Sequence, residues 1–283
     1  MRLAAAIIGA ATAFSTVPKT ADDGQKPVAD NRIAYSYEVN EDGKTATLTR
    51  AILPIGLKMV FVPEVIANYQ ITAIGARAYA GNFNLERVVV KSNVKSIGEK
   101  AFMSCTELKE VTLNEGIEKI PEDCFFSCPK LVSVQLPDTL TSIGDDAFYG
   151  CVALDIEIPA GVTSIGKNAV GMEAVSHSEG STAIRGFLIK GKTGSAAESY
   201  ALENGIDFID LNNYLAGDVN GDSSISSTDA STILAEYALV STGGASTLTK
   251  KQSILADING DGLINSSDAS VVLEIYAKNS TGG

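Results

Sequence analysis

The chain of 283 residues contains no tryptophan, a single histidine (His177), only four cysteines and no block of lysine or arginine. Without tryptophan it lacks the large aromatic side chain best suited to stacking on sugar rings, which counts against a glycosidase or a sugar-binding module. Its net charge of −12, with no basic patch to reverse it locally, disfavours nucleic acid and anionic membranes. His177 lies in an acidic, Ser-rich segment without an obvious nucleophile nearby, so it does not indicate a histidine-based active site.

The N-terminus carries the only conspicuous apolar run, Leu3 to Phe14, which follows Arg2. This run is shorter than the roughly 20 residues that a membrane-spanning helix needs. A basic residue, a short apolar run and a polar stretch with Pro18 are typical of a secretory signal. We therefore expect a signal peptide over 1–21, cleaved after Ala13 or Ala21, and a secreted protein without a membrane span. A buried N-terminal helix is the alternative.

Residues 74–170 contain an internal repeat that begins with Ile-Gly-x-x-Ala or a close variant. An aromatic residue follows each of the first four tags, then a leucine and a short alternating stretch. The tags start at Ile74, Ile97, Ile120, Ile143 and Ile165, so the offsets are 23, 23, 23 and 22. Repeats in the low twenties with one short strand each predict a β-rich leucine-rich-repeat solenoid, in which stacked coils bury a continuous core. Strand positions Val88, Val111, Val134 and Ile156, with their alternates, are expected to form its binding surface.

Both ends of this array have terminating signals. Residues 32–50 alternate on either side of Asp42-Gly43, which predicts a β-hairpin over the N-terminal end. Ser195 and Glu198 form a capping-box pattern before a short helix that stops at Gly205, and a strand is expected over 208–211. The solenoid is therefore predicted over 32–211, with about five repeats of 22–23 residues. A short linker over 212–217 follows.

The cysteines and acid pairs of the repeats are explained by structural roles. Cys105, Cys128 and Cys151 lie one repeat apart at apolar positions, so free buried thiols are expected. Disulfides or a metal site are the alternatives. The acid pairs Glu122-Asp123 and Asp145-Asp146 resemble the paired carboxylates of glycosidases. Because they occupy variable tag positions, we interpret them as solvated turn residues.

A twelve-residue, oxygen-rich loop occurs twice near the C-terminus, and Asp218 and Asp257, the first residues of the copies, are 39 residues apart. Oxygen side chains stand at positions 1, 3, 5, 9 and 12, and position 7 would supply its backbone carbonyl. This is the ligand pattern of an EF-hand-type calcium loop. The predicted ligands of two Ca²⁺ ions are Asp218, Asn220, Asp222, Ser224, Ser226 and Asp229 in loop one and Asp257, Asn259, Asp261, Leu263, Asn265 and Asp268 in loop two.

The two loops depart from the EF-hand pattern in two ways. Position 12 is Asp rather than Glu, and position 6 of loop one is Ser223 where glycine normally allows a sharp turn. Gly217 leaves no room for an incoming helix before loop one, so we expect units of loop plus exit helix. Residues 217–283 hold eight acids and three bases, a net charge of −5. Six of the acids are predicted ligands that would repel one another without metal, so folding of this segment is expected to depend on calcium.

Two resemblances follow from these motifs. The duplicated D-x-N-x-D-x5-S/N-x-x-D loops and their helices, over residues 218–283, resemble a type I dockerin of the ruminococcal cellulosome kind. The wording I-G-x-x-A-F-x-x-C-x-x-L is similar to BspA-like leucine-rich repeats of secreted bacterial proteins. The expected fold is thus a solenoid followed by a small all-α module with two loop–helix repeats.

The dockerin resemblance implies calcium-dependent binding to a cohesin module of a scaffoldin. By the same resemblance the cohesin-facing residues are Ser227, Thr228, Leu234 and Ala235 in the first copy and Ser266, Ser267, Leu273 and Glu274 in the second. These motifs predict a non-catalytic component of a polysaccharide-degrading complex, whose solenoid binds an unknown protein or glycan. The alternatives are a dockerin-bearing enzyme and a surface adhesin.

Overall fold

The N-terminal part of the computed structural model is a mixed β-sheet. The model describes residues 11–16, 32–91, 93–175 and 180–281, so His177 and residues 1–10 and 17–21 of the expected signal peptide lie outside it. β1 pairs antiparallel with β2, and β2 pairs with β3 across the Asp42-Gly43 turn, which confirms the predicted hairpin. The sheet contains β1 (Ala11–Thr16), β2 (Arg32–Val39), β3 (Thr45–Ile52), β5 (Val65–Ile66), β6 (Tyr69–Ile74) and β8 (Ser96–Ile97).

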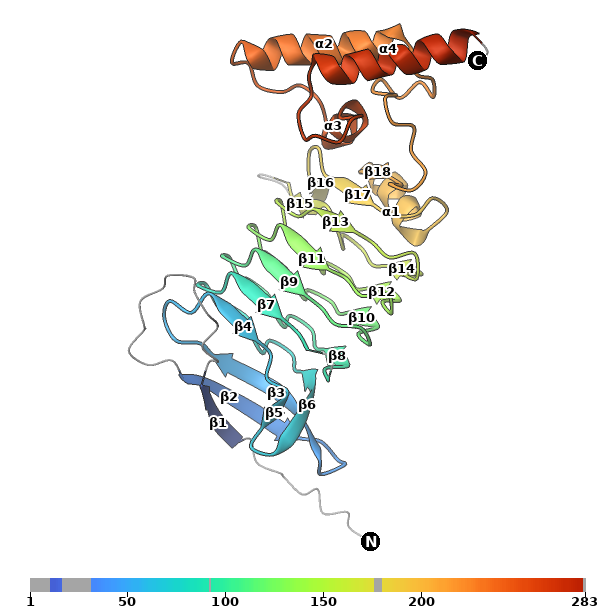
Figure 1. Cartoon of the computed structure of the whole chain (residues 1–283). Coiled ribbons are helices and arrows are strands. Elements are labelled where there is room, and N and C mark those ends of the chain that lie inside the picture. Colours follow the sequence, from blue (N-terminus) through green and yellow to red (C-terminus); the bar gives the residue numbers. More distant parts are fainter. Residues whose placement is uncertain (1–10, 17–31, 92, 176–179, 282–283) are drawn as a thin grey trace.

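Stacked coils follow this sheet and form a solenoid (Figure 1). The two coils that carry β9 with β10 and β11 with β12 contribute a strand of two or three residues to each of two parallel sheets, one strand more than the repeat pattern indicates. One sheet contains β4 (Met59–Phe61), β7 (Arg87–Val89), β9 (Glu110–Thr112) and β11 (Ser133–Gln135). The other contains β10 (Lys119–Ile120), β12 (Ser142–Ile143) and β14 (Ser164–Ile165).

The repeat residues explain why the coils stack. Val88, Val111 and Val134 are in register and buried, so the outward positions of these strands belong to their alternates. The rings of Tyr79, Phe102, Phe125 and Phe148 form a continuous stack with centroids 5.2 Å apart.

The cysteines of the repeats are free and buried, as expected. The thiols of Cys105, Cys128 and Cys151 each donate to a backbone carbonyl on the preceding coil, at 3.2–3.3 Å. Burial raises the pKa of the Cys151 thiol to about 12. These thiols therefore act as small core residues that also bond neighbouring coils together.

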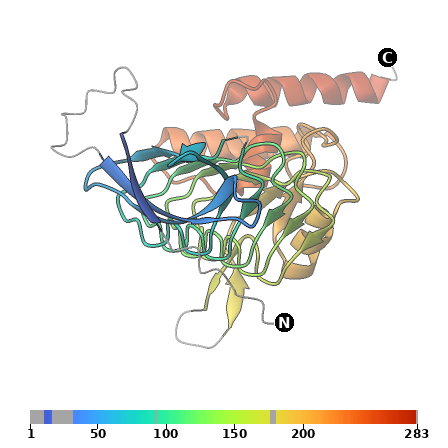
Figure 2. The same cartoon turned by 90° about the horizontal axis from the view of Figure 1, so that it is seen from below.

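The last coils become irregular. β15 (Met172–Ala174) and β16 (Ser181–Ala183) form an antiparallel hairpin that projects from the solenoid (Figure 2). β13 (Ile156–Glu157), β17 (Leu188–Lys190) and β18 (Asp207–Ile209) form the final parallel sheet. The predicted helix is α1 (Ala196–Asn204), whose N-cap Ser195 accepts from the Glu198 amide and whose C-cap Gly205 has a φ of 65°.

Beyond the linker the chain is helical. α2 (Ser227–Ser241), α3 (Lys250–Ala256) and α4 (Ser266–Thr281) form the C-terminal module, with α2 and α4 side by side. α3 lies directly before loop two, so the second copy has a short incoming helix, and the expectation of loop-plus-helix units was wrong for that copy. Its capping box, Thr249 with Gln252, is a signal in the sequence that could have revealed it. None of the described helices is long and apolar enough to cross a membrane.

Candidate calcium loops and docking face

Each oxygen-rich loop is closed by its position-12 aspartate. Asp229 and Asp268 are fully buried. Asp229 Oδ1 accepts from the amides of Val219 and Asn220 at 2.9 and 3.1 Å, and its Oδ2 accepts from the Ser226 amide at 2.9 Å. The shorter aspartate therefore reaches both ends of the loop.

Loop two repeats this arrangement. Asp268 accepts from the amides of Asn259 at 3.4 Å and Asn265 at 3.0 Å. At the start of the loop, Asp257 accepts from the amides of Asp261 and Gly262. The two predicted ligand sets therefore fold into equivalent loops.

Position 1 of loop one is also turned inward. Asp218 is 7% exposed, and its two oxygens accept from the amides of Gly221, Asp222 and Ser223 at 2.9–3.1 Å. Hydrogen bonds from Ser224 and Asn220 hold the pKa of Asp222 below its usual range. The carboxylates at positions 1, 5 and 12 of this loop are thus accounted for as hydrogen-bond acceptors.

Ser223 adopts the backbone conformation that glycine supplies in loop two. Its φ is 68°, and the φ of Gly262, at the same position, is 80°. The substitution therefore leaves the sharp turn intact and adds the strain of a left-handed non-glycine residue.

The chemistry of the donor set fits calcium. All predicted ligands offer oxygen, the donor that Ca²⁺ prefers. Among the described residues, the hydrogen-bond partners of the buried position-12 carboxylates include no cationic side chain. Over the described residues, three or more His, Cys, Asp or Glu side chains nowhere gather as a ready metal-binding group. Loop carboxylates instead bond to the loops' own amides. The loops thus present the right ligands in the right order, while convergence on a cation requires these hydrogen bonds to rearrange.

The exit helices begin with caps that belong to the loops. Ser226 caps α2 and forms a capping box with Asp229, and the Asn265 side chain accepts from the Ser267 amide at the start of α4. Positions 9 and 12 therefore serve the loop and the helix at once. A change at either position is expected to affect both.

The apolar side chains of the two exit helices are divided between a core and a surface. Ala230 and Ile233 are buried, together with Val219, Ala256, Ala269 and Val272. Leu234 and Tyr237, on the same helix, are 42% and 43% exposed. Their counterparts Leu273 and Tyr276 are 42% and 40% exposed. The duplication thus produces two matching exposed patches.

All eight residues assigned to partner binding lie on the surface. They are Ser227, Thr228, Leu234, Ala235, Ser266, Ser267, Leu273 and Glu274. Thr228 also bonds to the Asn220 side chain at 3.2 Å, so its hydroxyl is tied to the calcium loop.

Sequence reasoning missed Glu236, a buried carboxylate in the middle of α2. Burial opposes its ionisation, but hydrogen bonds from Ser246 and Thr247 outweigh that effect and hold its pKa below the usual range. Both of its oxygens accept from the Thr247 amide. Glu236 therefore holds the segment between α2 and α3 against the helix. Nothing in the helical periodicity distinguishes it from a solvated glutamate.

The solenoid offers a separate groove of about 610 Å³ along β8, β10, β12 and β14. Hydroxyls and charged groups of successive coils line it. They include Ser96, Lys119, Ser142, Asp145 and Ser164. The binding surface was expected at Val88, Val111, Val134 and Ile156, but all four side chains are buried. The three valines lie on the other solenoid sheet, and Ile156 lies on β13 of the final sheet.

The acid pairs Glu122-Asp123 and Asp145-Asp146 contribute to contacts between coils. Asp123 pairs with Lys100 at 3.2 Å, and Asp145 accepts from the Lys167 amide at 2.8 Å. Both are engaged in bonds between coils, which agrees with their interpretation as turn residues.

Comparison with known families identifies both parts of the chain. Residues 62–175 match the BspA type leucine rich repeat region in six copies, and residues 216–274 match the dockerin type I domain. The chain therefore combines a BspA-type leucine-rich-repeat solenoid with a type I dockerin domain, both non-catalytic families that imply a protein-interaction module.

Solved structures give similar matches for the solenoid. A leucine-rich repeat protein from Bacteroides ovatus is 31% identical, with 47% of this chain and 36% of that chain covered and a TM-score of 0.43. A leucine rich repeat protein from T. pallidum is 26% identical, covering 55% of this chain and 68% of that one, with a TM-score of 0.47. The chain thus spans just over a third of the B. ovatus protein. No curated protein matches the chain significantly.

Proposed function

We propose that this protein is a non-catalytic, secreted component of an extracellular polysaccharide-degrading complex. Its dockerin binds a cohesin module of a scaffoldin in a calcium-dependent manner, and its solenoid binds a protein or surface ligand. The observation that carries the proposal is the duplicated loop, closed in both copies by a buried aspartate and followed by an equally exposed leucine.

Calcium would neutralise the buried carboxylates and hold each loop against its exit helix. Asp218, Asn220, Asp222, Ser226 and Asp229, with the Ser224 carbonyl, are the ligands in loop one. Asp257, Asn259, Asp261, Asn265 and Asp268, with the Leu263 carbonyl, are those in loop two. Two ions would reduce the module's net charge from −5 to −1.

The matching patches around Leu234 and Leu273 support a cohesin site on α2 and α4. Because the patches are related by the duplication, either could face the same cohesin surface. Exposed leucine and tyrosine side chains beside Ser227, Thr228, Ser266 and Ser267 supply apolar contact with hydroxyl donors around it.

Calorimetric titration of the full chain against a panel of cohesins, first in calcium and then in excess chelator, tests this function. Tight binding to a cohesin that disappears with chelator is expected. Leu234→Ala and Leu273→Ala should each weaken binding, and the double variant should abolish it if both orientations are used. Leu202→Ala, which truncates an exposed leucine on α1, is the control. Calcium uptake without binding to any cohesin would refute the docking role.

A further inference from the structure

α3 belongs to two cores at once. Ala256 is fully buried in the dockerin core with Ile233 and Val272. Its neighbour Leu255, 6% exposed, instead packs with Leu188 of β17 and Ile209 of β18, and Ile254 covers the edge of the same cluster. Adjacent helical residues point about 100° apart, so one short helix can contact the dockerin on one side and the solenoid on the other.

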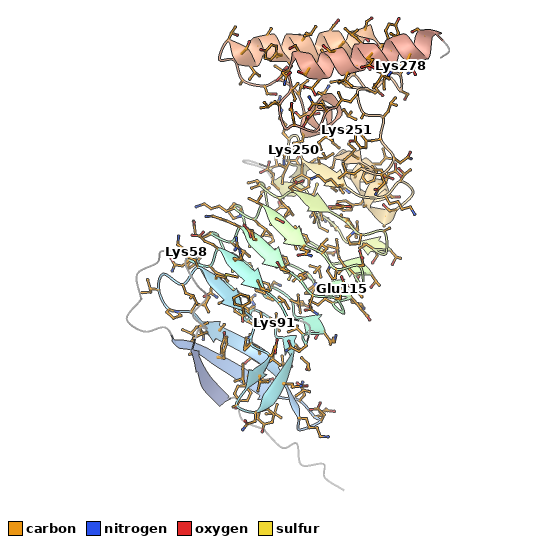
Figure 3. All side chains as sticks on the ribbon, in the orientation of Figure 1. Lys58, Lys91, Glu115, Lys250, Lys251 and Lys278 are labelled. Carbon is orange, nitrogen blue, oxygen red and sulfur yellow. The ribbon has the colours of Figure 1, made fainter. Side chains whose placement is uncertain are left out.

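This contact covers the end of the solenoid. β18 is the last strand of its sheet, and in the described part of the chain no further strand pairs with it. A solenoid needs a cap at its final coil, because each coil can bury its apolar face only against a neighbour. Leu255 and Ile254 supply that apolar cover. Lys250 adds a cation–π contact, with its Nζ 5.9 Å from the centroid of the Phe187 ring (Figure 3).

α3 is also hydrogen-bonded to the dockerin. The Gly217 amide donates to the Leu255 carbonyl at 2.9 Å, and the Gln252 side chain donates to the Val219 carbonyl at 3.4 Å. Gly217 has a φ of 94°, and a Cβ there would meet Ile258 at 3.0 Å. Loop two begins at Asp257, which is also the C-cap of α3. Both calcium loops therefore bear directly on this helix.

The linker adds a third attachment. Asp210, 7% exposed, follows β18 and accepts from the amides of Thr193 and Asn212 at 2.8 and 3.0 Å. The chain is thus bonded to the solenoid where it leaves β18, and bonded to α3 where it enters the dockerin.

We propose that α3 couples the two modules: it docks on the last coil as the solenoid's C-terminal cap, and calcium binding in the dockerin thereby stabilises β17 and β18. The partner of this solenoid end is the chain's own α3. A second consequence is a fixed orientation, with α2 and α4 on the far side of α3 from the solenoid (Figure 1). A bound cohesin would then be held away from the repeats. The coupling rests on the proposed calcium site but not on cohesin binding.

Hydrogen exchange of the full chain, with calcium and with excess chelator, tests the coupling. Chelator should raise the exchange rates of amides in 188–190 and 207–209 by about tenfold or more, since these strands lose their cover. Amides in β7 and β9, several coils away, should be unaffected. If α2 and α4 exchange freely in chelator while 188–190 and 207–209 keep their protection, the coupling is refuted.

Substitutions in α3 test its contact with β17 and β18 separately from general unfolding of the dockerin. Leu255→Lys should leave β17 and β18 exchanging fast even in calcium, while calcium uptake by the dockerin continues. Ile254→Lys, at the edge of the cluster, should have the same effect to a smaller degree. It replaces Leu255→Lys as the test if that variant fails to fold. Leu202→Lys makes the same change on α1, where the side chain is 81% exposed, and should change nothing. If β17 and β18 keep their protection from exchange in both α3 variants, the proposal is refuted, whatever the result with cohesins.

Discussion

The solenoid and the dockerin close their folds by different means. The solenoid has one continuous apolar cluster from Ile33 to Ile206, with aromatic rings and thiols repeated from coil to coil. The dockerin core has six buried apolar residues. Four of the five buried charged residues of the described chain also belong to the dockerin: Asp218, Asp229, Glu236 and Asp268. Apolar stacking needs no cofactor, whereas buried carboxylates must be compensated by hydrogen bonds or by a cation. Stability in the two regions should therefore respond to different perturbations.

Removal of calcium should produce the largest difference in stability between the two regions. Chelator is expected to abolish the helical far-UV circular dichroism of α2 and α4 and leave the β-signal of the coils, because we propose metal binding for the dockerin alone. Re-addition of calcium, with magnesium as the control ion, should restore the helices. Helical content that persists in chelator would show that the small core suffices by itself.

Phe125→Ala should destabilise the solenoid and leave the dockerin unaffected. Phe125 is fully buried between Phe102 and Phe148, and its truncation removes two ring contacts and leaves a cavity. A loss of about 3–5 kcal/mol in the solenoid's free energy of unfolding is expected by urea titration. Calcium uptake by the dockerin should persist. Phe83→Ala, which truncates a ring 61% exposed, is the control.

Gly98→Ala tests how closely the coils approach. A Cβ at Gly98 would lie 2.4 Å from the Ala76 nitrogen, so the two coils would have to separate. We expect a loss of about 1–3 kcal/mol in thermal or urea unfolding. Gly43→Ala is the matched control, because its φ of 64° introduces strain but no contact within 4 Å. An equal effect of both variants would argue against coil stacking as the reason for the glycine.

Tyr79→Phe should stabilise the solenoid, in contrast to Phe125→Ala and Gly98→Ala. The Tyr79 hydroxyl is buried and has no hydrogen-bond partner among the described residues, whereas the other coils carry phenylalanine in the same stack. Its removal is expected to stabilise the solenoid by about 1 kcal/mol. Tyr200→Phe should instead destabilise, since that hydroxyl donates to the Val170 carbonyl and accepts from the Val170 amide, both at 3.0 Å. Stabilisation by both substitutions would contradict this reasoning.

The smallest effect concerns a surface carboxylate. Hydrogen bonds from Lys109 and Lys58, on the two flanking coils, lower the pKa of Glu86 to about 2. A lowered pKa stabilises the fold above the ordinary value for glutamate, and the gain is lost as pH falls towards 2. Glu86→Gln should therefore cost at most about 1 kcal/mol at pH 7, because the pair is solvent-screened. Urea titrations of both proteins at a series of pH values should converge near pH 2; a constant difference would exclude ionisation as its cause.

Much of both regions could be predicted from periodicity. The repeat of Ile-Gly-x-x-Ala located the coils, the hairpin around Asp42-Gly43 was confirmed, and the cysteines are free and buried as their apolar positions indicated. The predicted oxygen ligands of both loops were assigned from spacing, and these residues fold into equivalent loops. Assignment of the loops to calcium and of the eight surface residues to a cohesin stays a prediction.

Failures of sequence reasoning share a cause. The second strand of each coil is only two residues long in β10, β12 and β14, too short to produce an alternating pattern. α3 has seven residues, too few for a periodic signal, and Glu236 is buried only because the segment around Thr247 folds back on it. The division of Ile233 from Leu234 depends on where α4 packs.

The sequence by itself determined the repeat period, the two modules and the order of the loop ligands, because these are properties of spacing along one chain. Only the tertiary structure decided which of two neighbouring apolar residues faces which core. Leu255 and Ala256 look alike in a hydrophobic pattern, yet one packs on the solenoid and the other on the dockerin. That assignment depends on contacts between residues far apart in the sequence, such as Leu255 with Leu188 and Ala256 with Val219, which local preferences do not encode.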